Sequence, residues 1–294
     1  MDDPCPETTM PKATRALIAT AVLSFAPGAA SAETLVWGQL DLRAGVGQVS
    51  TISGDNDAGR ASDPDTIEVT GRLGADWGAF GLQLDLMNGS QSFDESTSAA
   101  HRYGQFASLR ANYDFGGFVL GTVYGEGVAS ANTSVEATFD FYALEGAYRL
   151  GDSMIGLQIG AFDAQDLATT DAFHDGTFAR LSGLYALADG SVISGDLGLF
   201  AGSQDTNAVY DMDAQTLGVT YSRQIGARPL AWSLGVEYGR YEIFGAEAGA
   251  FSDTRMMLGL TTWFGDDDLA SAKRRGFLGQ PDFGRITSGG TLLD

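Results

Sequence analysis

The feature that most constrains the fold of this chain is a two-residue alternation of apolar and polar side chains. It recurs in segments of about ten residues along most of the sequence. In residues 81–89 (GLQLDLMNG), Leu82, Leu84 and Leu86 share one face while Gln83 and Asp85 share the other. Side chains alternate across a β-strand, so this period predicts strands with one apolar and one polar face. A chain built largely from such strands predicts an all-β fold.

The N-terminal region is predicted to be a secretion signal. Lys12 and Arg15 precede an apolar stretch, Ala16–Ala26, and Ala30–Ala32 form a small-residue cleavage site. The apolar stretch is too short to span a bilayer as a helix. The nine residues before Met10 are acidic in character, so either Met10 is the natural start or the signal begins atypically.

Composition and charge exclude several classes of protein. The single cysteine, Cys5, lies before the cleavage site, so the mature chain is expected to have no disulfide and no thiolate metal site. The chain carries 17 Lys and Arg against 38 Asp and Glu, and a charge of −20 remains once residues 1–32 are removed. That charge argues against nucleic acid as a partner. No later stretch is an apolar run of about 18 residues, the length that a transmembrane helix needs.

The strand pattern occurs in twelve segments, each near the ~9–11 residues that cross a bilayer at a tilt. Turn residues such as Gly78-Ala79 and Gly116-Gly117 join alternate pairs tightly, and polar loops join the others. Strict alternation of short and long connections is expected of a barrel whose ends both lie in the periplasm. We therefore predict an antiparallel up-and-down transmembrane β-barrel of about 12 strands, with 14 or 16 as alternatives. The predicted strands are Val36–Val49, Thr66–Trp77, Phe80–Ser90, Tyr103–Phe115, Phe118–Gly127, Val135–Leu150, Met154–Phe162, Thr177–Ala188, Val192–Gly202, Met212–Ile225, Leu230–Phe244 and Thr254–Phe264.

Three regions follow from this pattern: a signal at residues 1–32, a barrel at 33–265 and a tail at 266–294. The last predicted strand alternates apolar residues and ends on Phe264. It resembles the C-terminal signal by which the barrel-assembly machinery recognises bacterial outer-membrane proteins, although in that family the aromatic is usually the last residue. The tail is expected to extend into the periplasm, either without a role or to bind the cell wall or a periplasmic partner.

Aromatic residues gather at both ends of the predicted strands. They predict one belt beside the tight turns and another beside the long loops, as at the two interfaces of a membrane barrel. Ordinary strand-end aromatics of a soluble β protein are the alternative. The turn-side belt comprises Trp77, Phe80, Phe115, Phe118, Tyr148, Trp232 and Phe264. The loop-side belt comprises Tyr103, Tyr124, Phe139, Phe141, Phe178, Tyr241 and Phe244.

Most strand charges fall on one parity, and large aliphatic side chains such as Leu40, Leu42, Ile155 and Leu157 fall on the other. One Arg facing lipid at mid-membrane costs roughly 2–4 kcal/mol. The charged parity is therefore expected to face enclosed water, or to pair inside a closed interior. The predicted pore-lining residues are Asp41, Arg43, Glu68, Arg72, Arg110, Glu145, Arg180, Asp196, Glu237 and Arg255.

Beginning with VWGQLDLRAGVG at Val36–Gly47, the pattern as far as Phe264 resembles that of Gram-negative outer-membrane porins, particularly the alphaproteobacterial type. The resemblance is architectural. It implies passive diffusion of small hydrophilic solutes across the outer membrane, usually through homotrimers, and no cofactor. We predict a mild cation preference, because the mature chain and its loops are acidic.

Other functions stay open at this point. A plugged barrel would be structural or adhesive, and a soluble β-sandwich would share the alternation but not the sorted loops. An outer-membrane lipid hydrolase needs a serine positioned by a histidine, yet His101 and His174 lie at loop-side strand ends and no G-x-S-x-G is present. The Asp/Asn-rich Ser53–Gly59 lacks the distal Glu of a calcium loop, so no metal site is predicted.

Overall fold

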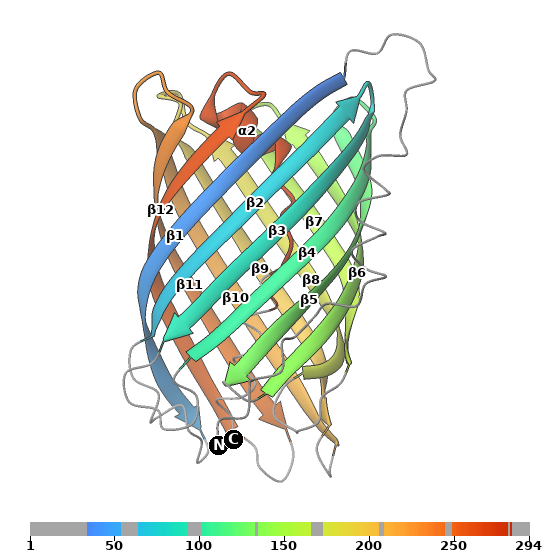
Figure 1. The fold of residues 1–294 in the computed structure, drawn as a ribbon, viewed down its shortest axis with the longest axis vertical. Coiled ribbons are helices and arrows are strands. Elements are labelled where there is room, and N and C mark those ends of the chain that lie inside the picture. The colour runs from blue at the N-terminus through green and yellow to red at the C-terminus, as the bar shows by residue number, and fades with distance from the viewer. Residues whose placement is uncertain are drawn as a thin grey trace, which may run out of the picture. The chain divides into compact units, whose positions relative to one another are not determined.

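The computed structural model describes residues 34–53, 64–92, 101–132, 135–165, 173–205, 209–244, 249–281 and 283. Each of its twelve antiparallel strands pairs with the next, and β1 pairs with β12 to close a barrel (Figure 1). The elements are β1 (Thr34–Ser53), β2 (Asp65–Trp77), β3 (Phe80–Ser92), β4 (His101–Asp114), β5 (Phe118–Asn132), β6 (Val135–Leu150), β7 (Ser153–Gln165), β8 (Phe173–Ala186), β9 (Val192–Asp205), β10 (Val209–Gln224), β11 (Leu230–Phe244), β12 (Gly249–Phe264) and α2 (Leu269–Arg275). The predicted fold class and strand number are confirmed.

Tight turns lie at one end of the barrel, which we call the turn end. Gly78, with φ of 61°, joins β2 to β3, and Gly151, also with φ of 61°, joins β6 to β7. A side chain is strained in this left-handed region, so glycine is the residue that these turns require. The predicted tight turns are confirmed.

At the opposite end, which we call the loop end, the connections are not uniformly longer, contrary to the predicted strict alternation. Only two residues separate β5 from β6 there, whereas five separate β8 from β9 at the turn end. Strands run further toward the loop end than predicted: β1 continues to Ser53 rather than Val49, and β12 starts at Gly249 rather than Thr254. The candidate calcium loop beyond Ser53 lies outside the described residues, as does the predicted signal at 1–32. Among the residues that the structure describes, no helix is long and apolar enough to cross a membrane.

The outer face of the barrel is apolar across the middle of the strands. Leu40, Leu42, Ile155 and Leu157 are all exposed there, on the parity predicted to face lipid. The predicted turn-side belt also lies on this outer face, with Phe80 and Phe115 each 61% exposed. Exposed apolar side chains in such number are expected where lipid replaces water, so the sorting fits a transmembrane barrel.

The predicted loop-side belt is wrong for four of its members. Phe139, Phe141, Phe178 and Tyr241 are 0–3% exposed and point into the barrel rather than toward lipid. Each of these aromatic residues is an even number of positions from an inward-facing charge on its own strand, so its side chain also faces inward. Tyr124 and Phe244 do lie on the outer face. The side chain of Tyr103 is outside the described residues.

The interior of the barrel is filled in three layers. Toward the turn end, apolar side chains that include Met154, Leu184 and Trp263 pack against Leu269 and Leu278 from the C-terminal segment. Charged side chains occupy the middle. Toward the loop end lies a cluster rich in phenylalanine. The layers matter for function because any path through the barrel must cross all three.

As far as residue 283, the described part of the C-terminal segment runs down the inside of the barrel, whereas the sequence led us to expect a segment that extends away from it (Figure 1). After β12, the Asp268 side chain caps α2 by accepting a hydrogen bond from the Ser271 amide at 2.7 Å, and Gly276 ends the helix. Leu269 and Phe283 are 0% and 1% exposed. Twelve strands enclose more space than wall side chains alone fill, so the segment gains apolar burial by folding inward.

Candidate functional site

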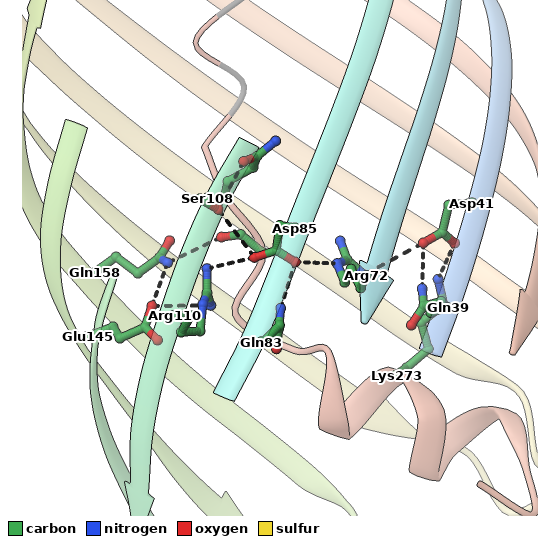
Figure 2. Close-up of polar contacts among 12 residues, drawn as sticks. Gln39, Asp41, Arg72, Gln83, Asp85, Ser108, Arg110, Glu145, Gln158 and Lys273 are labelled. Atoms are coloured by element: carbon green, nitrogen blue, oxygen red, sulfur yellow. Dashed lines mark hydrogen bonds and ion pairs between the residues drawn. The ribbon is translucent and has the colours of Figure 1, made fainter. Parts of the chain in front are cut away.

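The predicted pore-lining residues all face the interior, where nine of the ten take part in three sets of ion pairs in the middle of the barrel. Figure 2 shows the largest of these sets, which runs from Asp41 through Arg72, Asp85 and Arg110 to Glu145. Arg72 lies 3.6 Å from both Asp41 and Asp85, and Arg110 lies 3.4 Å from Asp85 and 3.2 Å from Glu145. Together these three sets, which we call the charged belt, comprise Asp41, Arg43, Glu68, Arg72, Asp85, Arg110, Glu145, Arg180, Asp196 and Glu237. Arg255 lies outside it and pairs with Asp253 at 2.6 Å.

Strand register brings these charges together. Arg43 on β1 is directly opposite Glu68 on β2, and their side chains meet at 3.1 Å. Arg43 also pairs with Glu237 of β11, which lies on the far side of β12 in the wall. Directly opposed charges on one face of a sheet attract one another, so the pairing stabilises this register as well as neutralising the wall.

Between β3 and β7 the charges of the belt are buried and ion-paired. Arg110 is 2% exposed and Asp85 is 0% exposed. Gln83 donates to Asp85 at 2.7 Å, and Gln158 donates to Glu145 at 2.9 Å. Buried charges are tolerated only when paired and hydrogen-bonded, and these amides complete the carboxylate shells. The sequence prediction did not select Gln83 or Gln158, although both share the parity of the charges.

On the other side of the interior the belt borders a cavity of about 150 Å³. Three arginines and four carboxylates line it together with Thr70, Thr216 and, from the C-terminal segment, Gln280 and Pro281. A polar space of this size is large enough for several water molecules. The charged residues lining it are Arg43, Glu68, Arg72, Asp85, Arg180, Asp196 and Glu237.

The C-terminal segment is bound to the belt by charged and polar contacts. Lys273 Nζ donates to Asp41 at 2.9 Å, and the carbonyl oxygen of Gly279 accepts from Arg180 at 2.9 Å and from Gln158 at 3.2 Å. Burial lowers the pKa of Lys273, while the neighbouring Asp41 carboxylate opposes that shift. The 2.9 Å contact makes Lys273 an ion-pair partner of Asp41 at the edge of the belt.

Nearer the loop end, Phe283 of the segment lies among aromatic side chains that we call the aromatic cage. Phe283 packs against five phenyl rings, at centroid distances from 4.6 Å for Phe141 to 6.3 Å for Phe200. An added Cβ at Gly125 of β5 would collide with Phe141, so glycine there makes room for that ring. The cage comprises Phe106, Phe141, Phe162, Phe178 and Phe200.

The two histidines do not come together. His101 is the first residue of β4 and His174 lies in β8, and these strands are not neighbours in the barrel. Both side chains are outside the described residues. Within the described part of the chain, no group of three or more His, Cys, Asp or Glu residues is arranged to hold a metal ion.

Comparison with known proteins places the fold. No protein-family model and no curated protein sequence matches the chain. An outer membrane channel from Pseudomonas putida F1 shares 16% identity at a TM-score of 0.50, over 82% of this chain and 100% of that one. The KdgM porin shares 14% sequence identity at a TM-score of 0.42, over 76% of this chain and 98% of that one. An anion-selective porin from Comamonas acidovorans shares 10% sequence identity at a TM-score of 0.38, over 79% of this chain and 99% of that one. The first likeness shows a shared fold, the porin-like barrel that the sequence pattern resembles.

Proposed function

We propose that this chain is an outer-membrane channel through which small hydrophilic solutes and ions diffuse passively, with both ends of the mature barrel in the periplasm. The observation that carries the proposal is the sorting of side chains in a closed barrel. Large apolar residues cover the outside, while ionised groups cross the inside as the charged belt around a polar cavity. An ionised interior offers a solute a wet route that the surrounding lipid does not.

The selectivity that we propose is a mild preference for cations. Three arginines and four carboxylates line the cavity, so its walls carry a small excess of negative charge. The chain as a whole is also acidic, with a formal charge of −21. Charged walls in a confined space raise the local concentration of counter-ions, here cations.

The test is conductance of the purified protein in planar bilayers, measured on the full chain and on a chain that ends at Phe264. The proposal expects ohmic steps from at least the shortened chain, with reversal potentials in a salt gradient that show cation preference. Clear anion preference would overturn the selectivity. A folded barrel that is silent in both forms would overturn the channel.

A structural or adhesive barrel is the second candidate, and one observation favours it. The C-terminal segment fills the interior from the apolar layer at the turn end to the aromatic cage. If that filling is permanent, the molecule does not conduct. Silence of both forms in the same bilayers, with binding of the protein to cells or surfaces, would support this second candidate.

For assembly we propose recognition of β12 by the barrel-assembly machinery and a homotrimer, both following from the resemblance to porins. Phe264 ends β12 and is 55% exposed, so its ring is accessible to a partner. Deleting Phe264 is expected to lower the yield of folded barrel in cells but not refolding in detergent. Mass photometry in detergent tests the trimer, and a monomer mass at all concentrations would contradict it.

A further inference from the structure

We propose that residues 266–283 form a displaceable plug, which closes the barrel when docked and opens it when it leaves. This inference rests on the proposed channel function and adds its regulation. The plug crosses all three interior layers: α2 lies in the apolar layer, Gly279 and Gln280 lie in the charged belt, and Phe283 lies in the aromatic cage. Docked in this way, it borders the side cavity of about 150 Å³.

The wall does not depend on the plug for its backbone hydrogen bonds. All twelve strands pair with both neighbours, and the ring closes between β1 and β12. The plug adds no strand to this sheet. Since a closed barrel has no edge left unpaired, the plug can leave without exposing a strand edge.

The wall side chains that the plug contacts in the charged belt also have partners in the wall. Asp41, which holds Lys273, also accepts from Thr261 at 2.5 Å and pairs with Arg72. Arg180, which donates to Gly279, pairs with Asp196 at 3.6 Å. Leaving a buried charge unpaired is the main cost of breaking such contacts, and the wall partners reduce that cost.

Two further wall contacts follow the same rule. Gln158, which donates to the Gly279 carbonyl, also donates to Glu145 at 2.9 Å. Ser108, which donates to Gln280 at 3.1 Å, is also within 3.5 Å of Asp85. The belt residues that contact the plug therefore keep partners in the wall when the plug is absent, which allows the plug to bind reversibly.

Gly156 of β7 marks where the wall is shaped to the plug. A Cβ built on Gly156 would lie 2.6 Å from Leu278 and 2.8 Å from Phe277, both in the plug, whereas the nearest wall atom, the carbonyl oxygen of Gly146, is 3.4 Å away. A larger side chain at Gly156 therefore competes with the plug but fits the wall. Gly89 of β3 is the matched position, because its added Cβ would meet its nearest atom, Glu68 Cγ of the wall, at 3.5 Å.

The experiment compares single-channel conductance of the full chain with that of Gly156→Leu and Gly89→Leu. Overpacking against Leu278 and Phe277 is expected to shift the equilibrium toward the open state by about tenfold or more. We expect the full chain and Gly89→Leu to be closed for most of the recording and Gly156→Leu to open often. The chain ending at Phe264 should stay open, and a synthetic peptide of residues 266–294 should block it.

The outcomes separate the plug from the channel. Equal conductance of the full chain, Gly156→Leu and Gly89→Leu would overturn the plug while leaving the channel in place. Silence of every folded form, including the shortened chain, would overturn the channel proposal itself. If the shortened chain does not fold, as judged by heat-dependent gel mobility, the comparison of the two leucine variants decides the question alone.

Discussion

The charged belt and the aromatic cage are built by overlapping sets of strands and from the same inward parity, yet they fill the interior differently. In the belt, wall charges pair with one another and leave a polar cavity beside Arg43 and Glu237. In the cage, five rings close on Phe283. Charges therefore leave a polar space beside the wall, whereas the rings fill their layer with apolar contacts that exclude water.

The largest effect is expected where the belt is most buried. Arg110→Met leaves Glu145 buried without its arginine and removes one of the two arginines that pair with Asp85. The free energy of unfolding should therefore fall by about 3–5 kcal/mol. Arg149→Met is the matched control, because Arg149 pairs with Asp114 at an exposed site and should lose only about 0–1 kcal/mol. Denaturant unfolding in detergent measures both. Equal losses would contradict a buried belt.

A smaller effect is expected in the cage, because it acts on docking of the plug rather than on the barrel. Phe283→Ala removes the ring that the cage surrounds and should weaken docking by up to about 3 kcal/mol. Trypsin cleavage after Lys273–Arg275 should then be faster, since cleavage follows the population of the undocked state. Asp267→Asn, at an exposed position of the same segment, should leave the rate unchanged. No change in Phe283→Ala would mean that the cage does not hold the plug.

The smallest effect is expected on selectivity, where one charge among several is altered. In the Gly156→Leu background, Glu237→Gln should weaken cation preference and Arg43→Gln should strengthen it, each by a few-fold, because both line the cavity. Reversal potentials in a salt gradient measure the change. Shifts of the same sign in both variants would contradict a role for the belt in the path.

The strand pattern predicted the wall of this barrel because a period of two is a local property. Parity also predicted that the belt charges face inward. The same parity places the cage phenylalanines inward, which the sequence prediction did not use. Phe141 shares the face of Glu145, and Phe178 shares the face of Arg180. Proximity to the long loops suggested an interfacial belt, but within a strand the face of a side chain is set by parity.

The course of the C-terminal segment was not predictable in the same way. Its helix has local signals, with a capping Asp268, a basic last turn and Gly276 at the end. Nothing in that short stretch shows where the helix packs. Its docking depends on contacts between residues far apart in the sequence, from 99 residues for Arg180 and Gly279 to 232 residues for Lys273 and Asp41. Alternation does not report contacts of this kind.

The most direct test of the central claim, that the chain occupies its own lumen, is thiol labelling at position 108. Ser108 is 2% exposed on the wall beneath Gln280, so Ser108→Cys places a small thiol under the plug; Cys5→Ser removes the only native one. A hydrophilic thiol reagent should modify Cys at this position slowly in the full chain and at least about tenfold faster in Gly156→Leu. Equal, rapid modification in both would show that the lumen is open and would contradict the account.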